Sequence, residues 1–255
     1  LYPKKTFDTN ILGTLNILES VRKIKKVRTT ILITSDKVYD VSSNRIFKET
    51  DKLGGADPYS ASKVCCENLF SSYMSSFFKG NFKQRIATVR AGNVIGGGDF
   101  STDRLIPDIY SSAKKNKKII LRYPQSVRPW QHVLEPLSGY IMLANFLHKN
   151  KLKGQVQNWN FGPNLDSCKS VKYVAKKFAK SLGLKVKIHR SKNKVFKPET
   201  GLLRLSNIKS KKYLNWQPKW NLNKSIEKII DWNKEKKYQN PLNICQKQII
   251  EFLKN

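Results

Sequence analysis

Residues 29–39 read Thr-Thr-Ile-Leu-Ile-Thr-Ser-Asp-Lys-Val-Tyr, an apolar run that turns polar after Ile33. β-Branched and apolar residues in such a run favour a buried strand. Ser35, Asp36 and Lys37 follow at the carboxyl end of the predicted strand. Because open α/β sheets bind ligands outside the carboxyl ends of their strands, these three side chains indicate a candidate site. A polar strand-to-loop exit without catalytic function is the alternative.

A second polar segment, Asp57-Pro58-Tyr59-Ser60-Ala61-Ser62-Lys63, predicts the start of a helix. Asp57 suits the N-cap and Pro58 the first helical position. Tyr59 and Lys63 are four residues apart and therefore share one helix face. A phenol has an ordinary pKa of about 10, and a neighbouring cation lowers it. The pair is therefore a candidate for taking a proton from an alcohol; a solvated lysine beside a packed tyrosine is the alternative.

The remaining chain alternates between helical and extended patterns. Apolar spacing predicts helices at about 5–26, 58–79, 105–116, 136–149 and 171–182, with a late helix around 226–233. Strands are predicted at 29–34, 85–90, 118–122, 156–161 and 186–189. The early helix–strand order is that of the later part of a doubly wound parallel sheet. We therefore expect an α/β chain with a sheet domain at 1–95 and a smaller α/β lobe at 96–255.

Bulk composition narrows the possible classes of protein. The net charge of +31 could indicate a nucleic-acid-binding protein, but the lysines are spread over nearly every polar face instead of forming one stripe, so we expect no nucleic-acid partner. No apolar run approaches membrane-spanning length, and no membrane partner is expected. The four cysteines show no Cys-x-x-Cys spacing and the three histidines are isolated, so no metal site is expected and a reducing cytoplasm fits best.

Further strings carry a resemblance to a known family. Beside the two segments above, they are residues 90–100 (Arg-Ala-Gly-Asn-Val-Ile-Gly-Gly-Gly-Asp-Phe), 103–108 (Asp-Arg-Leu-Ile-Pro-Asp) and 128–137 (Arg-Pro-Trp-Gln-His-Val-Leu-Glu-Pro-Leu). Together they resemble the extended short-chain dehydrogenase/reductases, and within them the CDP-glucose 4,6-dehydratases. The resemblance extends over most of the first two thirds of the chain. It implies a Rossmann-type sheet with a smaller nucleotide-sugar-binding lobe.

The resemblance also implies a reaction with bound NAD. CDP-D-glucose is oxidised at C4, loses water across C5 and C6 and regains hydride at C6, giving a 4-keto-6-deoxy sugar. Tyr59 matches the base for the C4 hydroxyl, Lys63 the group that holds the cofactor ribose, and Ser35 a hydrogen-bond donor to the C4 oxygen. Asp36 matches the acid for the departing C6 hydroxyl. Lys37 stands where many relatives acting on dTDP-glucose have glutamate as the C5 base.

Two points about Lys37 and the substrate contacts stay open. A lysine acts as a base only when its pKa is depressed, so Lys37 is either the C5 base or a structural ammonium paired with Asp36. Asn93, Arg104, Arg128 and Asn160 match substrate-binding positions, the two arginines those for the pyrophosphate. Surface ion pairs are the alternative for the arginines. No catalytic role is assigned to His132, and Trp130 is either a core residue or a stacking surface.

One expected motif is absent from the sequence. A dinucleotide fold carries a Gly-rich turn between its first strand and helix, and this chain has none. By resemblance, residue 1 falls inside the family's first domain, so the first strands are expected to be missing and the fragment alone to be inactive. A homodimer through the helices 5–26 and 58–79 is expected. An NAD-dependent nucleotide-sugar epimerase or reductase is the alternative enzyme; Asp36 and Lys37 argue against it.

Overall fold

The computed structural model describes residues 2–42, 45–78, 84–115, 119–149, 158–183, 188–190 and 203–254. The chain divides into two compact units. The first comprises Leu1–Gly92, Leu137–Gly162 and Leu205–Gln217, and the second Asn93–Pro136, Pro163–Arg204 and Pro218–Asn255. The chain first passes from the first unit to the second after Gly92, near the predicted boundary at residue 95. The chain then returns twice to the first unit, which a single boundary did not anticipate.

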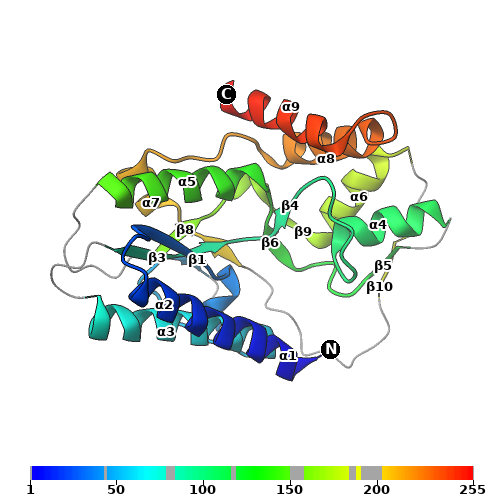
Figure 1. The fold of residues 1–255 in the computed structure, drawn as a ribbon. Helices are drawn as coiled ribbons and strands as arrows, with labels where there is room; N and C mark the ends of the chain where they lie inside the picture. Colours follow the sequence, from blue (N-terminus) through cyan, green and yellow to red (C-terminus); the bar gives the residue numbers. More distant parts are fainter. Residues whose placement is uncertain are drawn as a thin grey trace. The chain divides into compact units, whose positions relative to one another are not determined.

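A three-stranded parallel sheet forms the centre of the first unit (Figure 1). Its order is β1 (Thr29–Ile33), β3 (Arg85–Ala91) and β8 (Asn158–Phe161), with Ile33 opposite Val89 and Val89 opposite Trp159. The predicted strands at 29–34 and 85–90 are confirmed. Residues 156 and 157 of the third predicted strand lie outside the described residues. The other elements of this unit are α1 (Pro3–Phe7), the π-helix η1 (Asp8–Leu12), α2 (Gly13–Lys23), the 3-10 helix η2 (Asp36–Val38), β2 (Ile46–Phe47), α3 (Pro58–Phe77), most of α5 (Leu134–Lys149) and α7 (Ile208–Leu214).

Helices cover both faces of this sheet, as the doubly wound interpretation predicts. Successive side chains of a strand point to opposite faces. Ile86 accordingly packs with residues of α2 and α3, whereas Ala87 packs with residues of α5 and with Trp216. Figure 1 shows α2 and α3 on one side of the sheet and α5 on the other. The segments 137–162 and 205–217 belong to this unit because their apolar side chains pack with Ala87 and Val89 of β3 in one hydrophobic core.

Short strands and helices around one apolar core build the second unit. The core gathers side chains of α4, α6 and α8, together with Ile95 and Trp130. The elements are β4 (Val94–Ile95), α4 (Leu105–Lys114), β5 (Ile119–Leu121), β6 (Val127–Pro129), β7 (Gln131–His132), the 3-10 helix η3 (Leu165–Ser167), β9 (Cys168–Ser170), α6 (Val171–Ser181), β10 (Ile188–Arg190), α8 (Leu222–Glu235) and α9 (Pro241–Lys254). β11 (Arg204–Leu205) lies where the chain returns to the first unit and pairs with β2. Residues 186 and 187 of the predicted strand 186–189 lie outside the described residues.

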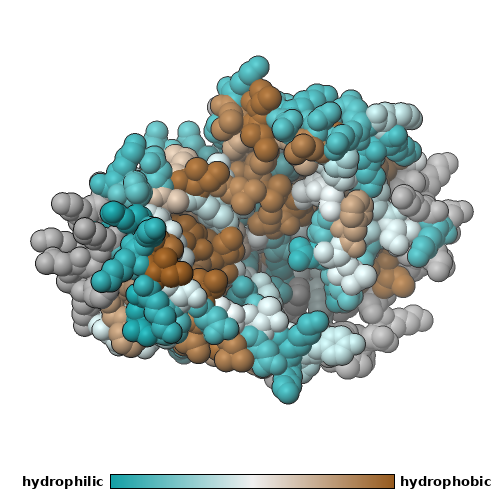
Figure 2. All heavy atoms as spheres, viewed as in Figure 1, coloured by the Kyte–Doolittle hydropathy of each residue, from teal (hydrophilic) through white to brown (hydrophobic). Residues whose placement is uncertain are grey.

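Two helices, α7 and α9, were not predicted. Pro241 lies beyond the predicted late helix and begins α9, because proline is tolerated in the first helical turn. The Asn240 side chain caps this helix by accepting the N–H of Leu242 at 2.9 Å. Ile249, Ile250 and Leu253 are exposed on α9, and Figure 2 shows a hydrophobic (brown) area over this helix. In the described part of the chain, no helix has the length and apolarity needed to span a membrane.

Candidate active site

The carboxyl end of β1 turns sharply into the first group of predicted catalytic residues. Ser35 is extended (φ −162°, ψ 157°) and caps η2, where its Oγ accepts the N–H of Lys37 at 3.2 Å. The same hydroxyl donates to Asp36 Oδ1 at 3.1 Å. Asp36 is only 4% exposed, whereas Lys37 is half-buried. The turn therefore holds a hydroxyl and a carboxylate in contact directly after the strand.

The N-terminus of α3 carries the second group. Asp57 is its N-cap, as predicted, and its Oδ1 accepts the N–H groups of Tyr59 at 2.9 Å and Ser60 at 3.1 Å. The Ser60 hydroxyl donates to Asp57 Oδ2 at 2.5 Å. Tyr59 follows in the first helical turn and is 41% exposed. A capped first turn thus presents a phenol that an incoming molecule can reach.

Two interactions bring the two groups together. Lys63 Nζ donates a hydrogen bond of 3.2 Å to the carbonyl of Ile33, the last residue of β1. The charge of Lys37 acts on Asp57: burial alone would raise the pKa of Asp57, but hydrogen bonds from Ser60 and the positive charge of Lys37 lower it below its ordinary value. The predicted catalytic residues of both groups therefore lie at one end of the sheet.

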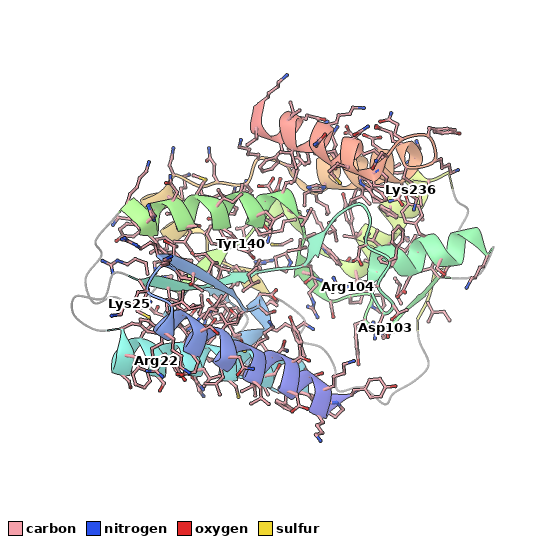
Figure 3. The ribbon with its side chains drawn as sticks, in the orientation of Figure 1. Arg22, Lys25, Asp103, Arg104, Tyr140 and Lys236 are labelled. Atoms are coloured by element: carbon pink, nitrogen blue, oxygen red, sulfur yellow. The ribbon has the colours of Figure 1, made fainter. Side chains whose placement is uncertain are left out.

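Tyr140 is a neighbour of this site that the sequence analysis missed. It lies on α5 (labelled in Figure 3) and packs edge-on against Phe161 with ring centroids 5.4 Å apart. Burial and then the negative charge of Asp36 raise the pKa of Tyr140 above its ordinary value. The phenol thus stays protonated near Asp36. Its position within an apolar helical stretch concealed it, because such a tyrosine usually belongs to a core.

Asn160 lies within the same unit but inside its packing. The side chain is fully buried: Nδ2 donates to the Phe47 carbonyl at 3.1 Å, and Oδ1 accepts the Tyr39 hydroxyl at 2.7 Å. Burial raises the pKa of Tyr39 to about 12, against the opposing charge of Arg90, so this hydroxyl remains a donor. The Asn160 N–H donates to Glu49 Oε1 at 3.0 Å. These contacts join β8 to the segment 47–49, and the match of Asn160 to a substrate-binding position stays a prediction.

The other predicted substrate-binding residues lie in the second unit. Asn93 precedes β4, and its carbonyl accepts the N–H of Gln131 at 3.1 Å. The Arg104 side chain is 63% exposed and forms an ion pair of 3.5 Å with Asp99 (Figure 3). Arg128 is buried, and its Nη1 donates to the Val127 carbonyl at 2.9 Å. Of the two arginines, Arg104 has the accessible guanidinium.

Two aromatic residues of the same segment are buried in the second unit. Trp130 belongs to its core and donates its indole N–H to the Lys169 carbonyl at 2.8 Å, which resolves the choice between core and stacking surface in favour of the core. His132 is 1% exposed and accepts the Leu134 N–H at Nδ1. Burial, with the charge of Lys228, lowers the pKa of His132 to about 4. Its imidazole is therefore neutral at neutral pH.

The described residues contain no group of three or more His, Cys, Asp or Glu side chains that could hold a metal ion. Cys65, Cys66, Cys168 and Cys245 are free thiols. The polar side chains gathered at the end of β1 include those of Ser35, Asp36, Lys37, Tyr59 and Lys63, which can donate and accept hydrogen bonds or protons. Lys63 has further N–H donors beyond the one given to Ile33, so an ammonium donor for a ligand hydroxyl is present beside Tyr59.

Comparison with known proteins places these observations in a family. The family model described as GDP-mannose 4,6 dehydratase matches residues 2–229. The CDP-glucose 4,6-dehydratase of Salmonella typhimurium is 40% identical over 97% of this chain and 70% of its own length. The dTDP-D-glucose 4,6-dehydratase of Dictyostelium discoideum is 27% identical over 66% of this chain, which spans 39% of that relative.

Solved structures share the fold at lower identity. A dTDP-glucose 4,6-dehydratase from Bacillus anthracis, in complex with NAD, superposes with a TM-score of 0.73 at 22% identity, covering 90% of this chain and 68% of that one. A UDP-glucose 4-epimerase from Thermotoga maritima, with UDP-glucose, gives 0.77 at 18% identity, covering 92% and 72%. These likenesses establish the Rossmann-type fold of this group of enzymes. Since the family model matches most of its length and the Salmonella relative is 40% identical, the chain belongs to the GDP-mannose 4,6 dehydratase family.

Proposed function

We propose that this chain carries the catalytic part of an NAD-dependent nucleotide-sugar 4,6-dehydratase that acts on CDP-D-glucose. The observation that carries the proposal is the 40% identity to the Salmonella CDP-glucose 4,6-dehydratase over 97% of the chain. The contact of Lys63 with the Ile33 carbonyl supports the proposal independently. This contact brings the pair Tyr59–Lys63 to the end of β1, where Asp36 and Lys37 follow. The product would be CDP-4-keto-6-deoxy-D-glucose.

The C4 hydroxyl of the sugar would meet Tyr59 and Ser35. Tyr59 takes the hydroxyl proton, and its partial exposure supports this role because the substrate must reach the phenol. Lys63 lies four residues further along the same helix face and is proposed to hold the cofactor ribose beside Tyr59. The Ser35 hydroxyl donates to Asp36 in the structure and is proposed to hydrogen-bond the C4 oxygen when the sugar is present.

Elimination of water requires an acid at C6 and a base at C5. Asp36 is proposed to protonate the departing C6 hydroxyl, and its contact with the Ser35 hydroxyl supports this role, because Ser35 is the residue proposed to meet the neighbouring C4 oxygen. Lys37 is proposed to take the C5 proton. The alternative role for Lys37 is a structural ammonium, which its electrostatic interaction with Asp57 would support.

The cofactor fits the residues that the structure describes at this site. Lys63 keeps N–H donors for the ribose hydroxyls, and the exposed Tyr59 leaves the adjoining surface accessible. When bound, NAD supplies the acceptor and donor of the hydride that leaves C4 and returns to C6. For the substrate, Asn93, Arg104 and Arg128 remain the proposed binding residues, since a guanidinium suits phosphate oxygens. Asn160 also stays a proposed binding residue, although its side chain is buried among Tyr39 and Phe47.

The experiment compares the full-length protein with its Asp36→Asn and Lys37→Met variants on CDP-glucose. Loss of a general acid or base lowers turnover by about 10²–10⁴-fold, and we expect this for dehydration by Asp36→Asn. Lys37→Met should also abolish solvent deuterium exchange at C5, which a structural ammonium would leave in place. If Asp36→Asn dehydrates the sugar undiminished, the assigned acid is wrong. C4 epimerisation without water loss by the wild type would favour the epimerase alternative.

We also propose a cytoplasmic homodimer, in keeping with the family resemblance. Leu12, Ile17 and Phe77 of the segment η1–α2 and of α3 are 51%, 50% and 41% exposed. Apolar side chains at these positions would be buried in a helical interface. Light scattering of the full-length protein tests this, and a monomer at micromolar concentration would contradict it.

A further inference from the structure

We propose that Glu67 is a positioning residue that holds the end of β1 in register with the Tyr–Lys helix, an inference that rests on the proposed function of Ser35, Asp36, Tyr59 and Lys63. Glu67 follows Lys63 by four residues on α3, so the two side chains share one helix face. Glu67 is 1% exposed. A carboxylate buried to this degree must have its charge and its lone pairs satisfied by partners.

The partners of Glu67 come from both neighbouring strands. Thr34 Oγ1 donates to Oε1 at 2.6 Å, and Thr88 Oγ1 donates to Oε2 at 2.9 Å. Arg90 completes the set with a fork of two bonds, Nε to Oε1 at 2.8 Å and Nη2 to Oε2 at 3.0 Å. Both Glu67 and Arg90 have side chains only 1% exposed. One carboxylate therefore ties α3 to β1 and to β3 at once.

The contact between Glu67 and the end of β1 is made by Thr34, the residue next to the proposed site residue Ser35. Thr34 directly precedes Ser35, and its own N–H donates to the Val89 carbonyl at 2.9 Å. On the neighbouring residue, the Ile33 carbonyl accepts Lys63 Nζ. Lys63 and Glu67, one helical turn apart on α3, thus hold Ile33 and Thr34, the two residues before Ser35. Lys63 is half-buried and is the group proposed to turn to the cofactor, whereas the Thr34–Glu67 contact is buried and does not depend on Lys63.

A purely structural account of Glu67 makes a different prediction. A buried Arg–Glu pair can often be replaced by apolar residues without loss of stability, so its presence is weak evidence for a stabilising role. If Glu67 only balanced the charge of Arg90, its two threonine donors would be interchangeable. If Glu67 positions the site, only the donor beside Ser35 matters to turnover. Thr34 and Thr88 are buried donors to the same carboxylate and so form a matched pair.

The test uses Thr34→Val and Thr88→Val in the full-length protein, with Thr34→Ser as the rescue variant. Valine keeps the shape of threonine and removes the hydroxyl, and Arg90 remains to balance Glu67. A displacement of about 1 Å at a catalytic group can cost about 10²-fold in rate. We expect Thr34→Val to lower kcat for CDP-glucose by about 10- to 100-fold with KM within about threefold. Thr88→Val should change kcat by less than about threefold, and Thr34→Ser should restore it.

A second measurement needs no substrate. Hydrogen exchange of the backbone amides in residues 34–39 should quicken by about tenfold in Thr34→Val and not in Thr88→Val, because local opening sets such exchange. Equal effects of both valine variants on kcat and on exchange, or no effect of either, would overturn the positioning role. If the wild type fails to convert CDP-glucose, the proposed function fails, while the exchange measurement still decides whether Glu67 fixes the end of β1.

Discussion

The first turn of α3 depends on the Asp57 carboxylate, and removing it should have a calculable effect. Alanine at an N-cap costs about 1 kcal/mol. Asp57→Ala also leaves the buried Ser60 hydroxyl without its acceptor at 2.5 Å. A hydrogen bond to a charged group contributes about 1.5–3 kcal/mol when buried, and we count about 1 kcal/mol because Asp57 itself is exposed. Asp57→Ala should therefore lower the free energy of unfolding by about 2 kcal/mol.

Asp57→Asn is the matched control, because asparagine caps helices as well as aspartate does. It loses only the negative charge near the helix N-terminus and near Lys37, which contributes about 0.3–1 kcal/mol. Urea unfolding followed by circular dichroism measures both variants at one pH. Equal losses in Asp57→Ala and Asp57→Asn would refute the reasoning, since the cap would then contribute nothing beyond its charge.

The pH dependence of unfolding tests whether the negative charge of Asp57 stabilises the folded protein. Hydrogen bonds from Ser60 and the charge of Lys37 outweigh burial and lower the pKa of Asp57 in the folded protein. An acid with a lowered folded pKa stabilises the fold above its unfolded pKa, which is about 4 for aspartate, and this stability is lost as the pH falls through the folded value. The difference between wild type and Asp57→Asn should therefore shrink below about pH 4. A difference that grows on acidification would contradict the assignment.

Two further predictions concern the second unit. A Cβ on Gly97 would lie 2.2 Å from Trp232 Cγ, so Gly97→Ala should destabilise by about 1–3 kcal/mol in urea unfolding; Gly13→Ala, whose Cβ would meet nothing within 4 Å, is the neutral or stabilising control. His132 has a folded pKa of about 4 and an ordinary value of 6.5, so the unfolded chain binds more protons between them and stability should fall as the pH drops across this window, by up to about 1.4 kcal/mol per pH unit. His132→Phe should remove that slope in unfolding midpoints measured from pH 4 to 7, and an unchanged slope would show that other groups cause it.

Local patterns in the sequence were sufficient for the elements that carry the proposed chemistry. The apolar run before Ser35 predicted β1, and the pair Asp57-Pro58 predicted where α3 begins, because caps and strand burial depend on a few neighbouring residues. Of the strands of two or three residues, β5 was predicted, whereas β2, β4, β6, β7, β9 and β11 were not, since so few residues carry no measurable period. The helix that begins at Pro241 was not predicted, because proline both follows helices and begins them.

The roles of buried polar residues could not be predicted in this way. Asn160 lies within β8, and its amide joins the Tyr39 hydroxyl to the Phe47 carbonyl across more than a hundred residues of chain. Nothing local in the sequence distinguishes Glu67 from an ordinary helical charge, because only the fold brings Arg90 to it. A polar side chain next to a strand can face a ligand or the interior, and the partners that decide between these outcomes are distant in sequence.

The sequence alone therefore determined the class of the fold, the family and the pair Tyr59–Lys63, because periodicity, capping and contiguous motifs are local properties of the chain. Tertiary structure alone decided how that pair is joined to Ser35 and Asp36. The Lys63 contact with the Ile33 carbonyl and the Glu67 contact with Thr34 link residues about thirty positions apart. Such contacts exist only once a strand and a helix have packed, since a buried charge must find its partners wherever the fold places them.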